Sequence, residues 1–395
     1  MYTLTEQLST RVNSTETSPI RKLIDMVDRT PNVIGLHAGE PDFDTPIHIR
    51  EAAKKALDEG YTHYAHTAGL PELREAIAEK LLKENNIKAD SETEITVTVG
   101  GFAALFSTFQ AVINPGDEVI VTEPSWPSYK GFTKLSGGIL VPLQLKAPDY
   151  PLDVNSLTEK ITEHTKMVVI NNPNNPTGAV YSPEQLRDLA SLAKKHDFLV
   201  LADEVYEKIV FDNTPHYSIA SFTAMKEKTI TVNSFSKTYA MTGWRVGYVV
   251  ANEQITSGIR RIHSYIASCV SPAFQKAALA AITAPDDCVQ RMVREYKERR
   301  DMTVEALNDI PLLQCIKPKG TFYLFPDVQG LGLPSADLAE QILKKAKVAT
   351  IPGSAFGSSG EGHLRMAIAV SKKDLLEAVK RIASFAKALP SRRDK

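Results

Sequence analysis

The middle of the chain alternates short apolar runs with longer amphipathic segments. The apolar runs are rich in valine and isoleucine and predict strands at residues 95–99, 119–121, 167–170, 198–202, 229–232 and 246–250. Between two of them, Ser182-Pro183-Glu184-Gln185 predicts the capped start of a helix that reaches His196. The run 198–202 contains no polar residue, as expected of a sheet covered on both faces. This alternation predicts an α/β fold with a mostly parallel sheet.

The segments before the sheet have a different pattern. Residues 1–19 are polar and aperiodic, which predicts an arm. A short helix is expected within residues 20–33, ending before Pro31. Further helices are expected to open at Pro46 and near Pro71, because proline is favoured in the first turn of a helix.

The C-terminal part of the chain predicts a smaller α+β domain. A long amphipathic helix is expected at 286–308, followed by strands at 321–325, 348–351 and 364–369 and by helices at 335–345 and after the N-cap Ser371. The charged tail 391–395 is expected to fray. We therefore divide the chain into an N-terminal arm with part of the small domain (1–45), a large domain (46–290) and a small C-terminal domain (291–395).

Composition narrows the classes of function. The chain has 395 residues and a formal net charge of −1, so no basic field attracts nucleic acid or an anionic membrane, and a small-molecule substrate is expected. The cysteines Cys269, Cys288 and Cys315 lie far apart, which favours a reducing cytosol over a disulfide framework. No apolar run could span a bilayer and the first twenty residues lack the core of a secretory signal, so we expect a cytoplasmic protein.

Two turns that could bind a ligand follow predicted strands. Ligands of such a sheet collect beyond the carboxyl ends of its strands. Gly100-Gly101-Phe102-Ala103 connects a strand to a helix, whose free N–H groups suit a phosphate. Asn172-Pro173-Asn174-Asn175-Pro176-Thr177-Gly178 follows another strand, and its prolines aim the Asn175 amide rigidly. Considered alone, the glycine pair favours a tight turn that binds nothing. The second segment could be a rigid surface turn, although its repeated Asn-Pro is much rarer than a generic turn.

Asp203 closes the apolar strand 198–202, and Tyr206 follows shortly after. A carboxylate at that position is only partly solvated and requires a cationic partner. The protonated nitrogen of a pyridine ring would serve, and Asp203 would keep that ring able to accept electrons. A salt bridge or a helix cap explains Asp203 equally well when it is considered alone. Its neighbour Glu204 points elsewhere and is interpreted as structural.

Lys237 lies in Ser234-Phe235-Ser236-Lys237, and Arg245 follows in Gly243-Trp244-Arg245-Val246-Gly247. An amine forms an imine with an aldehyde, while serine hydroxyls and a guanidinium fork bind a phosphate monoester. Pyridoxal phosphate carries both an aldehyde and a phosphate, so this stretch fits both ends of that cofactor. The alternative is a solvated surface lysine.

Two further residues fit a substrate site. Arg365 lies in an otherwise apolar segment, where a substrate α-carboxylate or a structural ion pair would satisfy its charge. Trp126 offers a flat face for stacking, or it packs in the core. The histidines show no ligand spacing, and no metal site is expected.

Taken together, these motifs resemble the class I aminotransferases of fold type I, the aspartate-aminotransferase-like superfamily that uses pyridoxal phosphate. The resemblance covers roughly residues 20–390. It is carried by Ala38-Gly39-Glu40-Pro41-Asp42-Phe43, Asn174-Asn175-Pro176-Thr177-Gly178, Asp203-Glu204-Val205-Tyr206 and the two segments around Lys237 and Arg245. It implies a large domain with a seven-stranded type of sheet, a smaller α+β domain and a homodimer with shared active sites.

The resemblance also implies a role for individual residues. Lys237 forms the imine with the cofactor and moves the proton, Asp203 pairs with the ring nitrogen, and Tyr206 and Asn175 bind the phenolic oxygen. Trp126 stacks on the ring. The phosphate is contacted by Gly101, Phe102, Ala103, Ser234, Ser236 and Arg245, with Tyr64 reaching it from the neighbouring subunit. The substrate is bound by Arg365, which takes the α-carboxylate, with Gly39, Asn175 and Trp126 nearby.

One residue departs from the pattern of some aspartate-using members, which place a lysine directly after the glycine pair. This chain has Phe102 there. We therefore expect an amino donor with an apolar, aromatic or thioether side chain, reacting with a 2-oxo acid, and an aspartate-preferring enzyme is a lower-ranked alternative.

Alternative functions include some with and some without pyridoxal phosphate as the cofactor. A carbon–sulfur β-lyase on the same fold would use Lys237 for the same proton abstraction. A non-catalytic regulatory domain that senses pyridoxal phosphate would need a DNA-binding segment, and too few residues precede Gly39 for one. A nicotinamide dehydrogenase would need Gly-x-Gly-x-x-Gly after the first strand, which is absent.

Overall fold

The computed structural model describes residues 8–13, 15 and 19–389. Its centre is a seven-stranded sheet in the order β2-β8-β7-β6-β5-β3-β4. These strands are β2 (Ile95–Thr98), β3 (Glu118–Glu123), β4 (Ile139–Gln144), β5 (Thr165–Asn171), β6 (Leu199–Asp203), β7 (Thr229–Ser234) and β8 (Gly247–Val250). The mostly parallel α/β sheet predicted from the alternation of apolar runs is therefore confirmed.

The structure adds two details to the predicted sheet, namely the direction of each strand and one further edge strand. β3, β5, β6 and β7 pair in parallel, whereas β8 runs antiparallel to both of its neighbours, β2 and β7. The sequence pattern did not predict β4, which pairs in parallel with β3 at the sheet edge. It contains Pro142 and is only half-buried, so it lacks the apolar run of a central strand.

Helices cover both faces of the sheet. Between residues 46 and 290 they are α3 (Ile47–Asp58), α4 (Pro71–Asn85), α5 (Gly100–Val112), α6 (Ser128–Leu135), α7 (Val154–Lys160), α8 (Pro183–His196), α9 (Phe235–Thr238), α10 (Glu253–Ala267) and α11 (Pro272–Thr283). The predicted capping box is present at α8, where the Ser182 hydroxyl and the Gln185 side chain each accept a backbone N–H of the other residue. None of the helices in the described ranges is long and apolar enough to cross a bilayer.

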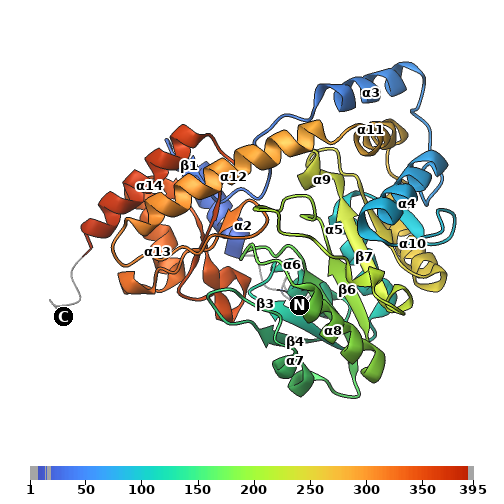
Figure 1. Cartoon of the computed structure of the whole chain (residues 1–395), viewed down its shortest axis with the longest axis horizontal. Helices are drawn as coiled ribbons and strands as arrows, with labels where there is room; N and C mark the ends of the chain where they lie inside the picture. Colours follow the sequence, from blue (N-terminus) through green and yellow to red (C-terminus); the bar gives the residue numbers. More distant parts are fainter. Residues whose placement is uncertain (1–7, 14, 16–18, 390–395) are drawn as a thin grey trace, which may run out of the picture.

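The C-terminal elements gather on one side of the molecule (Figure 1). They are α12 (Asp287–Asn308), β9 (Tyr323–Leu324), α13 (Ser335–Gln341), β10 (Val348–Ala349), β11 (Ile351–Pro352), β12 (Leu364–Ala367) and α14 (Lys372–Lys387). β11, β12 and β9 form an antiparallel sheet in that order. The predicted helix at 335–345 continues beyond α13 as a π-helical turn to Ala346.

The N-terminal segment joins this C-terminal group. β1 (Ile34–Gly35) pairs in parallel with β10, and α2 (Pro19–Asp28) precedes it. In Figure 1 the blue β1 accordingly lies among the orange and red elements. Within the predicted arm, the described residues include the short helix α1 (Thr10–Asn13), while residues 1–7, 14 and 16–18 of the arm and the tail 391–395 lie outside the described residues. The predicted domain boundaries near residues 45 and 290 stay a prediction.

Candidate active site

A cavity of about 540 Å³ opens where three central strands end. β5 ends at Asn171, β6 at Asp203 and β7 at Ser234, and all three residues line it. Carboxyl ends of parallel strands meet at one edge of a sheet, which explains why residues far apart in the chain converge here. Of the predicted site residues, the cavity wall includes Gly39, Gly101, Phe102, Trp126, Asn175, Asp203, Tyr206, Ser234, Ser236, Lys237, Arg245 and Arg365.

Lys237 projects into the cavity from the short helix α9. This helix begins directly after β7 because the Ser234 hydroxyl accepts the backbone N–H of Ser236 at 3.1 Å. The Lys237 ammonium donates a hydrogen bond to the carbonyl oxygen of Gly39. Burial lowers the pKa of Lys237 to about 8, with Glu40 acting against this shift and Arg365 adding to it. The lysine is therefore close to neutral at a mildly alkaline pH, as a nucleophile or a base requires.

Asp203 is buried at the end of β6, with 4% of its surface exposed. Its Oδ2 accepts a hydrogen bond from the Tyr129 hydroxyl at 2.6 Å, and its Oδ1 accepts the Val205 N–H at 3.3 Å. Burial raises the pKa of Asp203 to about 6, although these two hydrogen bonds oppose the shift. A buried carboxylate with an incompletely bonded oxygen is ready to hold a cationic group.

Arg245 and the start of α5 form a cradle for an anion. A Cβ on Gly100 would lie 2.5 Å from Nη2 of Arg245, so only glycine lets the guanidinium approach the helix start so closely. The same guanidinium donates to the carbonyl oxygen of Thr242 at 2.7 Å. Ser234 and Ser236 lie in the same cavity wall, with their hydroxyls 2.9 Å apart. Helix N–H groups, hydroxyls and a guanidinium together suit a phosphate.

Arg365 lies on β12, with 4% of its surface exposed. Its Nη1 donates to Oδ1 of Asn175 at 3.2 Å and its Nη2 to the carbonyl oxygen of His37 at 2.7 Å. Its Nε is buried and has no hydrogen-bond partner among the described residues. No carboxylate is paired with this guanidinium in the described part of the chain, so the predicted alternative of a structural ion pair is not observed. A bound carboxylate would supply the missing charge.

Aromatic rings form one wall of the cavity. Phe102 is half-exposed (49%) and meets Trp126 edge-on, with 5.5 Å between ring centroids. Phe102 also meets Phe132 edge-on at 5.0 Å. The side chain that follows the glycine pair is therefore an apolar surface that faces the cavity.

Two of the predicted contacts are not part of this wall. Ala103 lies on α5 and does not line the cavity. Tyr64 is 89% exposed and also does not line the cavity. Their predicted roles at the phosphate stay predictions, and that of Tyr64 requires a neighbouring subunit.

Several residues that line the cavity were not predicted from the sequence. They include His37, Tyr129, Asn171 and Tyr323. The hydroxyl of Tyr323 lies 2.9 Å from that of Tyr206, and its ring lies 4.4 Å from the Arg365 guanidinium. The only signal for Tyr129 and His37 was their closeness to Trp126 and Gly39 in the chain, and such closeness does not specify the direction of a side chain.

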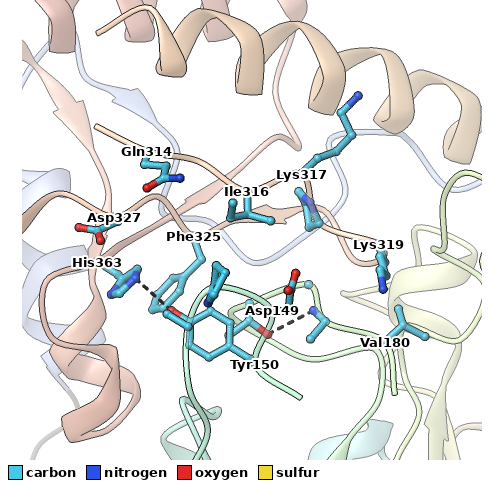
Figure 2. Close-up of a pocket in the computed structure, with 16 residues that line it drawn as sticks. Asp149, Tyr150, Val180, Gln314, Ile316, Lys317, Lys319, Phe325, Asp327 and His363 are labelled. Atoms are coloured by element: carbon cyan, nitrogen blue, oxygen red, sulfur yellow. Dashed lines mark hydrogen bonds between the residues drawn. The ribbon is translucent and has the colours of Figure 1, made fainter. Parts of the chain in front are cut away.

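A smaller cavity of about 90 Å³ lies between residues 147–150 and 177–180 on one side and C-terminal segments on the other (Figure 2). Figure 2 shows the Tyr150 hydroxyl pointing at the His363 ring, 3.0 Å from its Nε2. The His363 ring stacks on Phe325 at 4.9 Å. None of the predicted site residues lines this cavity. The contact between Tyr150 and His363 joins the segment after β4 to the residue directly before β12, the strand that carries Arg365.

Comparisons with known proteins agree with this geometry. The family model for aminotransferase class I and II matches residues 31–382. This chain belongs to that family. The aspartate aminotransferase of Pyrococcus abyssi is 45% identical, covering 95% of this chain and 97% of its own length. Aromatic-amino-acid aminotransferase 2 of Thermococcus litoralis is 42% identical, covering 96% and 98%. The structure of the Thermus thermophilus aspartate aminotransferase with maleate matches with a TM-score of 0.90 at 38% identity, covering 95% and 99% of the two chains.

The chain is therefore a transaminase that depends on pyridoxal phosphate and acts on amino acids and 2-oxo acids. The residues around the cavity fit this cofactor. The aminotransferase has an anion cradle at Gly100 and Arg245, an amine at Lys237 with a lowered pKa, and a buried carboxylate at Asp203. The unpaired Nε of Arg365 fits the carboxylate that every amino acid substrate carries.

Proposed function

We propose that this aminotransferase prefers an L-amino acid donor with an apolar, aromatic or thioether side chain. The observation that carries the proposal is Phe102, which faces the cavity half-exposed and edge-on to Trp126. Among the described residues of the wall, the lysine and arginine side chains are Lys237, Arg245 and Arg365, and each has another proposed role. A second substrate carboxylate would thus be desolvated against aromatic carbon without a cation.

The relatives do not decide this preference, because their names include both aspartate and aromatic-amino-acid aminotransferases. The proposal therefore depends on the cavity of this chain. An aspartate-preferring enzyme remains the competing proposal, and the experiment described below separates the two.

We assign the cofactor contacts to the residues that line the cavity. Pyridoxal phosphate, when bound, supplies an electrophilic aldehyde and a ring that accepts electrons. Arg245, Ser234, Ser236 and the N-terminus of α5 at Gly101 and Phe102 bind its phosphate, with Ala103 and the partner's tyrosine as further predicted contacts. Trp126 stacks on its ring. Charge-assisted hydrogen bonds of this kind contribute about 1.5–3 kcal/mol each.

The polar groups on the ring are held by three side chains in the proposal. The Asp203 carboxylate keeps a proton on the ring nitrogen, because a buried negative charge favours the protonated neighbour. Tyr206 and Asn175 donate hydrogen bonds to the phenolic oxygen. Asn175 also accepts from Arg365 at 3.2 Å, so the cofactor and substrate contacts share one amide.

Lys237 is the proposed general base. Its pKa of about 8 leaves an appreciable neutral fraction near physiological pH. Arg365 holds the substrate α-carboxylate, assisted by Gly39 and Asn175, and thereby places the Cα proton within reach of the Lys237 amine. The carbonyl oxygen of Gly39 already accepts from that amine, which orients it before substrate binds.

We further propose a homodimer with shared active sites. Several large apolar side chains on α3, α10, α11 and the Tyr64 loop are exposed: Ile47 59%, Tyr64 89%, Tyr265 87% and Phe274 37%. Apolar surface of this kind is typical of a protein interface. A second copy would cover it and bring Tyr64 to a phosphate site. The cytoplasmic location and the three-part domain division also stay proposals from the sequence.

The donor preference is tested with Phe102→Lys. An ammonium at this position should raise kcat/KM for aspartate relative to phenylalanine and methionine by roughly 10- to 100-fold, since it pairs the side-chain carboxylate inside the cavity. Phe102→Leu is the matched control, because it removes the ring without adding charge and should not favour aspartate. If aspartate is already much the best donor of the unmodified enzyme, the preference proposed here is wrong.

A further inference from the structure

Tyr129 has no role in the assignments above, yet it contacts the buried Asp203 directly. It lies in the first turn of α6, shortly after Trp126, and its ring meets the Trp126 ring edge-on at 5.6 Å. Only 1% of its surface is exposed. Its hydroxyl donates to Oδ2 of Asp203 at 2.6 Å. Tyr129 thus contacts the Trp126 ring and also brings a hydrogen-bond donor to Asp203 in the cavity wall.

The hydroxyl of Tyr129 is a permanent donor. Burial, reinforced by the negative charge of Asp203, raises the pKa of Tyr129 well above its usual value. The phenol therefore keeps its proton throughout the physiological range, and Asp203 must be the acceptor. A carboxylate accepts such a bond better than a neutral carboxyl group does, so the contact stabilises the ionised form of Asp203.

The two oxygens of Asp203 differ as a result. Oδ2 is occupied by the short bond from Tyr129, whereas Oδ1 has only the longer 3.3 Å contact with the Val205 N–H. The carboxylate is thereby fixed in rotation, with one oxygen bonded to the protein and the other available. The pKa of Asp203 is about 6 even with this hydrogen bond, so a loss of the bond would bring protonation into the neutral range.

We propose that Tyr129 is a positioning residue that keeps Asp203 ionised and leaves its Oδ1 available for the protonated ring nitrogen of pyridoxal phosphate. The inference rests on the role of Asp203 under Proposed function. It predicts that the hydroxyl of Tyr129 contributes to cofactor binding most strongly where Asp203 would otherwise take up a proton.

The test compares Tyr129→Phe with the unmodified protein as cofactor-free enzymes, by titration with pyridoxal phosphate and fluorescence readout. Near pH 6, where Asp203 titrates, the variant should bind roughly 5- to 50-fold more weakly if loss of the bond raises the pKa of Asp203 by about one to two, because the unmodified carboxyl is itself half-ionised there. Roughly three pH units higher, where the carboxylate is mostly ionised in both proteins, the affinities should converge. An affinity equal to that of the unmodified protein near pH 6 would overturn the inference.

A purely structural role of Tyr129 gives a different result. Loss of packing would weaken binding by the same factor at both pH values, and that outcome also refutes the inference. Tyr296→Phe is the matched control, because Tyr296 is a buried tyrosine whose hydroxyl has no hydrogen-bond partner among the described residues. It should bind the cofactor like the unmodified protein at both pH values. Circular dichroism and unfolding temperature verify that each variant is folded.

A third variant separates this inference from the proposed role of Asp203. Asp203→Asn cannot ionise, so it should bind the cofactor weakly at both pH values. If Asp203→Asn binds normally, the role of Asp203 itself is wrong. If Asp203→Asn binds weakly while Tyr129→Phe binds normally near pH 6, only the role of Tyr129 is wrong.

Discussion

Two lysines, Lys80 buried and Lys237 partly buried, have opposite electrostatic surroundings. Lys80, on α4, forms an ion pair with Glu207 and donates to Oδ1 of Asn85 at 2.7 Å. The charge of Glu207 raises the pKa of Lys80 against the effect of burial. Within the described part of the chain, Lys237 donates to a backbone carbonyl oxygen, and burial lowers its pKa to about 8. The same residue type is a stabilising ion in one place and a reactive amine in the other.

Two neighbouring carboxylates show the same contrast. Glu204 accepts from the Ser218 hydroxyl at 2.5 Å, and Ser218 also accepts from Asn85, so Glu204 belongs to the Lys80 network. Asp203 faces the cavity. Burial raises both pKa values, to about 8 for Glu204 and about 6 for Asp203. Buried polar groups that are bonded to one another are structural, whereas those left incompletely bonded mark the place of a ligand.

The largest effect is expected from removal of the reactive amine. Lys237→Ala should reduce turnover by about four orders of magnitude or more, since it removes both the nucleophile and the base. It should still bind pyridoxal phosphate through the remaining contacts. Single-turnover spectra with a good amino donor measure the loss. Normal turnover would contradict the assignment of Lys237.

Lys80→Met tests the structural side of the comparison. It should lower the free energy of unfolding by about 3–5 kcal/mol, because Glu207 is left buried and unpaired. Urea unfolding measures this value. The double variant Lys80→Met with Glu207→Leu should recover most of the loss. A folded Lys80→Met enzyme that had lost its turnover would show that the two lysines are not functionally distinct.

Arg365→Gln should mainly impair substrate binding. Loss of the buried guanidinium removes about 2–5 kcal/mol of interaction with the substrate carboxylate, which appears in kcat/KM. Cofactor affinity should remain close to normal. A uniform loss of substrate and cofactor binding would instead indicate that Arg365 supports the site only through Asn175 and His37.

The smallest effect concerns the pH dependence of stability in the cofactor-free protein. Burial lowers the pKa of Lys237 to about 8, while an unfolded lysine titrates near ~10.4. Between these two values the unfolded chain binds more protons at this position, so the stability of the folded protein should rise with pH. Lys237→Met should lack this contribution. Thermal unfolding of both proteins across the interval measures the difference, and parallel curves would contradict the lowered pKa.

Much of the fold could be predicted because apolar runs identify strands that are buried on both faces. β5, β6 and β7 were predicted within a few residues, since their buried central positions carry mostly apolar or β-branched side chains. β4 was missed because a half-buried edge strand with Pro142 has no such run. β1 and β10 pair over only two residues each, too few for any periodic signal.

The sequence by itself determined which residues end the central strands, and therefore that Asp203, Ser234, Lys237 and the Asn175 loop share one edge of the sheet. Chain connectivity and strand direction suffice for that conclusion. Only the tertiary structure decided that Tyr129 meets Asp203, that Tyr323 lies over Arg365, and that Lys80 is paired with a carboxylate while Lys237 donates to a backbone carbonyl oxygen. Those contacts join segments far apart in the chain, and their geometry depends on packing, which no local pattern encodes.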